Sequence, residues 1–259
     1  MKLGVCGDPQ NSQVLAEAGF EYVELNVQSH LKPLEDESVF AAELERIRSS
    51  ALPTPVANVF VPGSLKISGP EADLAALEAY VRVVFARARR AGIQTIVLGS
   101  GGARRIPEGY DRGAAWQQLV AFGKMIGPLA QAHDIVIVVE PLNQQECNVL
   151  TSVGESGRYV EDVNHPAVRL LVDAYHWAKD DHSEEDIVAY GHLLRHVHIA
   201  TVSSRLAPGL EPYDFTAFFR ALGKTGYDGL ISIEARWSDL SLEAAGAYQA
   251  LKHLTAPAG

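Results

Sequence analysis

Four ionisable residues in the second half of the chain come at the ends of short apolar runs: Glu140, Asp173, His198 and Glu234. These runs are rich in Val, Ile and Leu and cover Ile135–Glu140, Val168–Asp173, His196–Ile199 and Leu230–Glu234. Such runs, bounded by turn residues, are typical of buried strands. An ionised group at the end of a buried strand is costly unless another charge compensates it. Three carboxylates and an imidazole are suitable ligands for a divalent cation, so the pattern predicts a metalloenzyme.

Each of these residues, taken singly, also has a structural explanation. A glutamate such as Glu140 at a strand end can equally form a salt bridge or cap a helix. Four polar residues at the ends of four consecutive strands are harder to explain in that way, because this is where parallel barrels carry their catalytic groups. The set as a whole therefore favours the metal-site interpretation.

Strand-like segments recur along the whole chain. We predict eight of them, at Lys2–Cys6, Tyr22–Leu25, Pro55–Val59, Thr95–Gly99, Ile135–Glu140, Val168–Asp173, Arg195–Ile199 and Leu230–Glu234. Segments with helical spacing of apolar residues lie between them, at Asn11–Ala18, Val39–Ser49, Glu71–Ala91, Ala114–Ala132, Val153–Asp162, Glu184–Tyr190, Asp214–Leu222 and Leu240–Leu254. Gly19, Gly92 and Gly226 stand just before the next strand, where glycine commonly ends a helix.

This alternation predicts an α/β protein that forms one (β/α)₈ TIM barrel over residues 1–259. The length of 259 residues agrees with that fold, which typically takes roughly 250 residues. An open Rossmann sheet is disfavoured because Gly7-Asp8-Pro9 follows the first strand, in place of Gly-x-Gly-x-x-Gly. In a barrel the C-terminal ends of all strands meet at one face, so the four polar residues are expected to converge there.

Composition and charge exclude several classes of protein. The formal net charge of -10 opposes a nucleic-acid-binding surface, which needs clustered Lys and Arg. The apolar runs are too short for a membrane span, and the N-terminal run turns polar at Gly7-Asp8, too early for a signal peptide. Cys6 and Cys147 make no disulfide framework, and Cys6 is expected to act as a small buried hydrophobic residue. We therefore expect a cytoplasmic protein with no nucleic-acid or membrane partner.

Other polar residues lie close to the predicted strand ends. His176 comes three residues after Asp173 and should reach the same site from the start of its loop. Glu146 lies in a polar loop and, taken alone, is a solvated charge. Glu24 and Asn58 lie at the ends of the second and third strands, so they also direct polar groups towards the C-terminal face.

Two further groups have more than one interpretation. His196 lies two residues before His198, so both share one face of the strand, and we expect His196 to be a buried, hydrogen-bonded core histidine. Arg205 follows the seventh strand, where it could hold a substrate oxygen or offset the surplus of acidic groups. Arg104 and Arg105 follow the fourth strand and could pair with a phosphate. Phosphate sites in barrels usually follow strands seven and eight, so a flexible loop that shapes the site is favoured.

The chain resembles the xylose isomerase-like TIM-barrel superfamily, in the branch of sugar epimerases and isomerases that includes D-tagatose 3-epimerase, D-psicose 3-epimerase and hydroxypyruvate isomerase. The resemblance covers nearly the whole length and is most specific at Val139–Asn143, Asp173–His176, His196–Ala200, Arg205–Gly209 and Tyr227–Glu234. It implies one divalent ion, Mn²⁺ ahead of Mg²⁺, Co²⁺ or Zn²⁺, held by Glu140, Asp173, His198 and Glu234. It implies that the oxygens of a small sugar substrate are bound by Glu146, His176 and Arg205. A homodimer or homotetramer is left open.

The same resemblance implies a mechanism. The metal binds the carbonyl and a neighbouring hydroxyl oxygen of a keto sugar or a small hydroxy-ketone. Either Glu140 or Glu234 removes the proton on carbon, and the metal stabilises the resulting enediolate as a Lewis acid. The other glutamate returns a proton to the opposite face, which is what a two-base epimerisation requires.

Three other functions are compatible with a barrel of this kind. A lyase of the inosose dehydratase type could use the same metal and base to expel a hydroxyl group. An endonuclease IV-type DNA repair nuclease needs additional histidines for three zinc ions, whereas Glu24 and Asn58 lie at the corresponding strand ends, and the net charge opposes DNA binding. A non-catalytic sugar-binding barrel is disfavoured because all four expected ligands are present.

Overall fold

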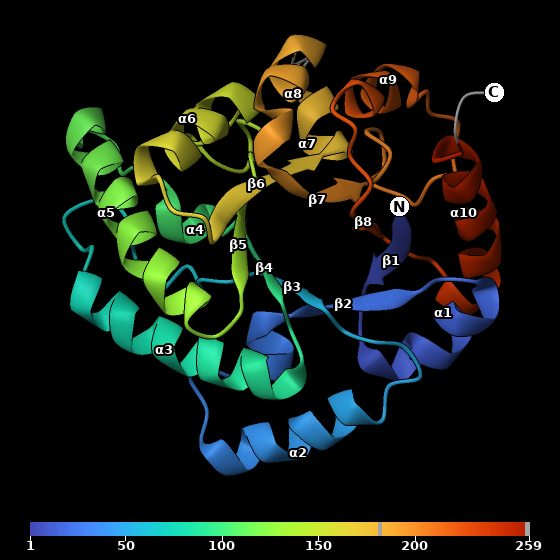
Figure 1. The fold of residues 1–259 in the computed structure, drawn as a ribbon, viewed down its shortest axis with the longest axis horizontal. Coiled ribbons are helices and arrows are strands. Elements are labelled where there is room, and N and C mark those ends of the chain that lie inside the picture. The colour runs from blue at the N-terminus through green and yellow to red at the C-terminus, as the bar shows by residue number, and fades with distance from the viewer. Residues whose placement is uncertain (181–182, 257–259) are drawn as a thin grey trace.

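The apolar runs form the strands of a closed parallel barrel in a computed structural model that describes residues 1–180 and 183–256. Within these residues the strands follow the order of the chain around the barrel, from β1 to β8, and β8 pairs with β1 (Figure 1). Their bounds are β1 Lys2–Cys6, β2 Tyr22–Asn26, β3 Val56–Asn58, β4 Thr95–Leu98, β5 Val136–Val139, β6 Val168–Asp173, β7 Leu194–Ile199 and β8 Leu230–Ile233. The predicted single-domain (β/α)₈ barrel is confirmed.

Helices surround the barrel and connect consecutive strands (Figure 1). The α-helices are α1 Ser12–Ala18, α2 Glu37–Arg48, α3 Leu74–Ala91, α4 Gly101–Arg104, α5 Arg112–Gln131, α6 Val153–Val163, α7 Ala174–Lys179, α8 Glu184–Tyr190, α9 Thr216–Lys224 and α10 Leu240–Leu254. Short 3₁₀ or π turns occur at Pro9–Asn11, Val27–Leu31 and Gly191–Leu193. Helices α4 and α7 were not expected from the sequence, because they are too short to show a helical period of apolar residues.

The predicted helix ends at glycines are confirmed. Gly19 ends α1 with φ 110° and Gly92 ends α3 with φ 79°, and both backbone N–H groups donate to carbonyls of the preceding turn. Gly226 also has a positive φ of 71°. A residue without Cβ takes this left-handed conformation at little cost, which lets the chain turn sharply into the next strand.

The interior of the barrel changes from apolar to polar along the strands. Its apolar layer is a buried cluster of Tyr22, Val56, Val97, Val138 and Leu171. The Tyr22 hydroxyl lies 2.8 Å from Ser232 Oγ, and Ser232 begins a polar layer that also contains buried Glu24, His196 and His198. Strand pairing places Asp173 beside His198 and His198 beside Ser232. The register therefore fixes which polar side chains meet at the C-terminal end.

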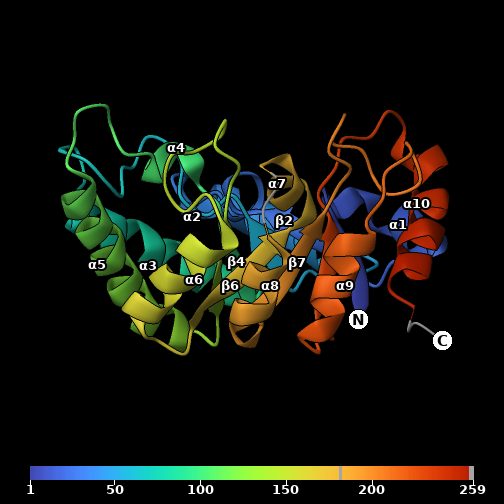
Figure 2. The ribbon, with the colours of Figure 1, turned by 90° about the horizontal axis from the view of Figure 1, so that it is seen from above.

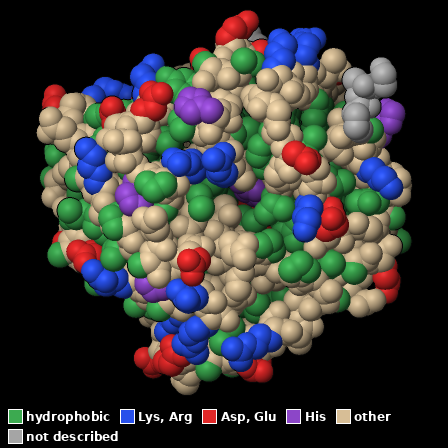
Figure 3. All heavy atoms as spheres, in the orientation of Figure 1, with side chains coloured by type: hydrophobic (Ala, Val, Ile, Leu, Met, Phe, Trp, Pro, Cys, Tyr) green, Lys and Arg blue, Asp and Glu red, His purple; other side chains and the backbone are tan. Residues whose placement is uncertain are grey.

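The loops after the strands lie on one side of the barrel. Figure 2 shows α4 and α7, which follow β4 and β6, on the side of the molecule opposite the N-terminus. On the face that Figure 3 shows, acidic and basic side chains are interspersed. Among the described residues, no helix is long and apolar enough to cross a membrane.

The alternative in which Arg104 pairs with a phosphate is wrong. Its side chain is fully buried, with Nη1 donating to the Leu98 carbonyl at 3.0 Å and Nη2 to the Glu140 carbonyl at 2.7 Å. Nη2 also lies 3.2 Å from the Leu150 carbonyl. The guanidinium thus links the ends of β4 and β5 and fixes the backbone of Glu140. Arg105 is exposed and donates to the Glu146 carbonyl at 2.8 Å.

Replacing Gly4 with alanine is expected to destabilise the barrel, because an added Cβ would lie 2.3 Å from the Tyr22 ring. Overpacking of this kind typically costs about 1–3 kcal/mol. Chemical denaturation measures the loss. Gly246→Ala is the control, since a Cβ at this exposed position in α10 meets no atom within 4 Å, and alanine in a helix is favoured over glycine by up to about 1 kcal/mol. Equal stability of the two variants would contradict this account of the barrel interior.

Arg104→Gln is expected to lower the free energy of unfolding, because buried carbonyls at the ends of β4 and β5 lose their donors. Each unsatisfied group costs about 1–3 kcal/mol. Arg105→Gln removes an exposed guanidinium of the same loop and should change stability by no more than about 0.5 kcal/mol. Denaturation midpoints of the two variants, measured side by side, test this. A stable Arg104→Gln protein would remove the structural role.

Candidate metal and substrate site

Acidic side chains from three strands meet at the C-terminal face of the barrel. Glu140 follows β5, Asp173 ends β6 and Glu234 follows β8. Together with His176 in α7, each offers one ligand atom, and these atoms lie within 4.8 Å of one another. Glu140, Asp173 and His176 are buried, whereas the Glu234 side chain keeps 22% of its exposure. The predicted convergence of strand-end residues is therefore present for these groups.

The donor set fits a divalent cation. Asp173 Oδ1 accepts from the Tyr175 N–H at 2.9 Å, but the buried Oδ2 accepts no hydrogen bond from the described residues. Burial and the nearby Glu140 carboxylate raise the pKa of Asp173. Burial, with Glu140 and Asp173 close by, raises the pKa of Glu234 to about 7. Closely spaced carboxylates resist ionisation together, and a bound cation removes that cost.

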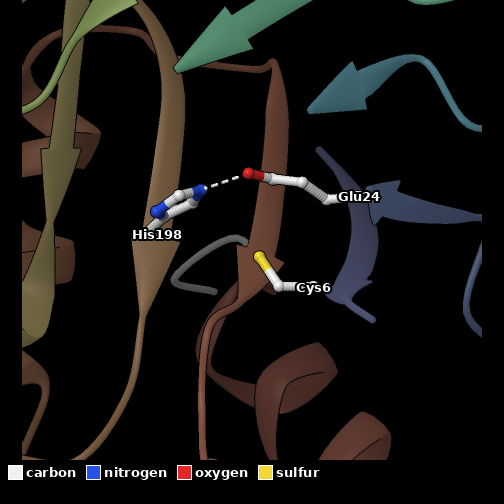
Figure 4. Close-up of side chains that lie close together, drawn as sticks. All are labelled: Cys6, Glu24 and His198. Carbon is white, nitrogen blue, oxygen red and sulfur yellow. Dashed lines mark hydrogen bonds and ion pairs between the residues drawn. The ribbon is translucent and has the colours of Figure 1, made fainter. Parts of the chain in front are cut away.

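His198 lies beside the acidic group, which is formed by the carboxylates of Glu140, Asp173 and Glu234. Its Nδ1 is 3.1 Å from Glu140 Oε1 and 3.9 Å from Glu234 Oε2. Burial opposes ionisation of Glu140, but the hydrogen bond from His198 lowers the pKa of that carboxyl below its usual value. His198 also lies close to Cys6 and Glu24, which together form a second group of metal-compatible donors (Figure 4). The structure thus brings Glu140, Asp173 and Glu234 together and places the fourth predicted ligand, His198, in contact with them.

Glu24 was noted in the sequence only as a polar strand end. Its carboxylate is fully buried and accepts from Ser232 Oγ at 2.6 Å. Oε2 lies 2.7 Å from His196 Nε2, and Oε1 lies 2.8 Å from His198 Nε2. Burial opposes the charge, but the two histidines hold the pKa of Glu24 well below its usual value. His196 is buried and hydrogen-bonded, as predicted.

Cys6 is partly buried in this group, close to the expectation of a small core residue. Burial and the neighbouring Glu24 carboxylate raise the pKa of the Cys6 thiol well above its usual value. The thiol is therefore protonated at neutral pH, as expected for a group that is neither a nucleophile nor a reactive thiolate.

Arg205 also contacts the acidic group. It forms an ion pair with Glu234, its Nη1 is 3.5 Å from Glu146 Oε1, and its guanidinium lies 4.5 Å from the centre of the Tyr175 ring. Burial opposes its charge, but the carboxylates around it raise the pKa of Arg205, so it is always protonated. Asn58 Nδ2 donates to Glu234 Oε1 at 3.0 Å. Both oxygens of Glu234 are therefore held by donors.

Asn143 connects the predicted substrate-binding residues and was missed in the sequence. It is buried, and its Nδ2 lies 3.0 Å from Glu146 Oε1 and 2.8 Å from His176 Nδ1. Its backbone N–H also donates to His176 Nδ1, at 3.2 Å. Its Oδ1 accepts from the backbone N–H groups of Gln145 and Glu146, which fixes the orientation of the amide. An asparagine in a loop gives no periodic signal. Its position three residues after Glu140 is the one feature of the sequence that could have indicated it.

The comparisons with known proteins agree with this fold. A ketose 3-epimerase of Arthrobacter globiformis is 34% identical over 102 residues, which cover 39% of this chain and 35% of that enzyme. The matched part is thus well under two thirds of that relative. A crystal structure of a D-allulose 3-epimerase from Methylomonas sp. in complex with D-allulose superposes with a TM-score of 0.84 at 21% identity, over 98% of this chain and 96% of that one.

A solved IolI protein with a bound zinc atom superposes with a TM-score of 0.72 at 16% identity, over 98% of this chain and 96% of that one. A family model described as a xylose isomerase-like TIM barrel matches residues 12–256. The chain therefore belongs to the xylose isomerase-like TIM-barrel family, with distant homology to ketose 3-epimerases and hydroxypyruvate isomerases.

Proposed function

We propose that this protein is a metal-dependent epimerase or isomerase that acts on a keto sugar or a small hydroxy-ketone. The observation that carries the proposal is the group of carboxylates at the C-terminal face of the barrel, in which the buried Asp173 Oδ2 accepts no hydrogen bond from the described residues. Glu140, Asp173, His198 and Glu234 hold the cation in this proposal, and Mn²⁺ is the expected ion because it accepts carboxylate and imidazole ligands together. The cytoplasmic location and a homo-oligomeric state stay predictions.

The hydrogen bonds support His198 rather than His176 as the histidine ligand. His176 Nδ1 faces two N–H donors, both from Asn143, so it must be an acceptor. In the neutral imidazole the proton is then on Nε2, which lies 3.6 Å from Asp173 Oδ2. A protonated nitrogen cannot ligate a metal, but it can donate to a substrate oxygen. In His198 the roles of the two nitrogens are exchanged. Its Nε2 faces the Glu24 carboxylate, and its Nδ1 is the nitrogen directed at the acidic group.

The remaining residues bind and orient the substrate. His176 Nε2–H and the Arg205 guanidinium donate to substrate oxygens next to the reacting carbon, and the Glu146 carboxylate accepts from a hydroxyl group. A divalent cation, when bound, draws electron density from the carbonyl oxygen as a Lewis acid. Charged donors that are already fixed by neighbours, as Arg205 is by Tyr175, stabilise developing negative charge without reorganisation.

The proton transfers are assigned to Glu140 and Glu234. One carboxylate removes the proton from the carbon next to the carbonyl, which leaves an enediolate. The other glutamate delivers a proton to the opposite face of the same carbon, and the centre is inverted. Arg104 donates to the backbone carbonyl of Glu140 and Asn58 to the carboxylate of Glu234, and the two glutamates lie on either side of Asp173 and His198 in the strand order.

Removal of divalent ions with a chelator is expected to abolish activity and to lower the melting temperature. Binding to the native state alone adds about 2.7 kcal/mol at a free-ion concentration 100 times the dissociation constant, so adding back Mn²⁺ should restore both. Calorimetric melting and a ketose panel, with elemental analysis of each sample, provide the measurements. Full activity in a sample shown to be metal-free would end the proposal.

Glu140→Gln and Glu234→Gln are each expected to lower kcat by at least about 10²-fold, because general acid–base groups contribute 10²–10⁴-fold. The losses should not add in the double variant, since both groups serve one proton transfer. Glu161→Gln, at an exposed position in α6, is the matched control and should retain full activity.

In D₂O the wild-type enzyme is expected to place deuterium at the inverted carbon, because the proton returned comes from a carboxylic acid that exchanges with solvent. Mass spectrometry and NMR of the product detect the label. A product without deuterium would rule out the enediolate route. A product lacking the elements of water would assign the dehydratase activity instead.

A further inference from the structure

Glu24 is a buried carboxylate that the proposed mechanism does not use. It lies in β2 inside the barrel, one layer below the acidic group, with no exposed surface. Figure 4 shows its carboxylate directed at the ring of His198, which comes from β7 on the other side of the barrel. Burying a charge is costly unless every oxygen is well paired, so a glutamate here needs an explanation.

The partners of Glu24 are all donors. Ser232 Oγ and His196 Nε2 are within 2.7 Å of Oε2, and His198 Nε2 is 2.8 Å from Oε1. An ionised carboxylate only accepts hydrogen bonds, so each of these histidine nitrogens presents an N–H. For His196 the other nitrogen, Nδ1, makes no hydrogen bond within the described residues, which agrees with a proton held on Nε2.

The same constraint decides which nitrogen of His198 is available. With a proton held on Nε2 by Glu24, Nδ1 is the nitrogen of His198 that can present a lone pair to a cation. This atom faces the acidic group, 3.1 Å from Glu140 Oε1 and 3.9 Å from Glu234 Oε2. A carboxylate on the far nitrogen fixes the orientation of a metal-bound histidine and increases the basicity of the ligating nitrogen.

We propose that Glu24 is a positioning residue that holds His198 with Nδ1 directed at the metal. This inference rests on the proposed function for the assignment of His198 as a ligand. Cys6 provides the competing arrangement, because Cys6, Glu24 and His198 also offer donor atoms within 4.8 Å of one another. A cation in that second group requires the lone pair on His198 Nε2, so the position of one proton distinguishes the two arrangements.

Glu24→Gln is the test variant, since glutamine has the same size but can turn its amide N–H towards His198 Nε2. The proton of His198 can then move to Nδ1, and the site loses a ligand. We expect the affinity for Mn²⁺, measured by titration calorimetry on the metal-free full-length protein, to fall roughly 10- to 100-fold.

Ser232→Ala is the matched control. It disturbs the same carboxylate through its other oxygen, Oε2, and leaves the bond between Glu24 Oε1 and His198 Nε2 in place. We expect this variant to lower the melting temperature without changing the Mn²⁺ affinity. An equal loss of affinity in Glu24→Gln and Ser232→Ala would reduce Glu24 to a structural role and overturn the proposal, as would wild-type affinity in a folded Glu24→Gln protein.

A spectroscopic measurement on the wild type covers the case in which Glu24→Gln does not fold. Long-range ¹H–¹⁵N correlation spectra of the protein loaded with diamagnetic Zn²⁺ report which ring nitrogen of His198 carries the proton. We expect it on Nε2. A proton on Nδ1 would place the cation in the group of Cys6 and Glu24 and would overturn the proposal.

Different results would refute the proposed function and the role of Glu24. If the wild type binds no divalent ion and keeps its activity after chelation, the proposed function fails. The spectrum of the metal-free protein still reports on Glu24 in that case, because its contact with His198 requires a proton on Nε2. A bare Nε2 in that spectrum would refute the positioning role by itself.

Discussion

Repulsion between buried carboxylates is the constraint on which the arrangement of this barrel depends. Glu140, Asp173 and Glu234 lie at the ends of three strands that the closed barrel brings to one face. At such short separations in a poorly solvated site, like charges cost several kcal/mol unless a cation or a proton intervenes. Burial first, and the neighbouring carboxylates after it, raise the pKa of Glu234 and of Asp173, whereas the contact with His198 lowers the pKa of Glu140. The charged residues next to these carboxylates reduce this electrostatic cost.

The layers below the site supply rigidity rather than chemistry. Tyr22 fills the barrel over Gly4 and contacts Ser232, so the apolar layer is in direct contact with the polar one. Arg104 donates to the Glu140 carbonyl and so fixes the backbone there. These contacts are made with buried, hydrogen-bonded groups, which hold catalytic side chains more exactly in place than exposed loops do.

The sequence was sufficient for the fold and for most strand-end residues, because both follow from periodicity. The bounds of β1 and β6 agree with the prediction, and Glu140 and Glu234 come one residue after their observed strands. Periodicity gave no information on Asn143 or on the burial of Arg104, since both depend on loops whose path is set by tertiary contacts. The phosphate alternative for Arg104 fails for a physical reason: a guanidinium satisfies backbone carbonyls as readily as it binds phosphate.

The two histidines at the site show why residue type alone cannot assign a metal ligand. His176 offers a donor atom within 4.8 Å of those of the three carboxylates, whereas His198 contacts Glu140 at 3.1 Å and also lies in the group of Cys6 and Glu24. Their partners differ, because Asn143 donates to His176 whereas Glu24 accepts from His198. In the proposed function the amide therefore leaves His176 with an N–H for the substrate, and the carboxylate leaves Nδ1 of His198 as the nitrogen that can bind the cation. On the proposed function, Asn143 and Glu24, which contact these histidines, determine which of them binds the metal and which binds the substrate.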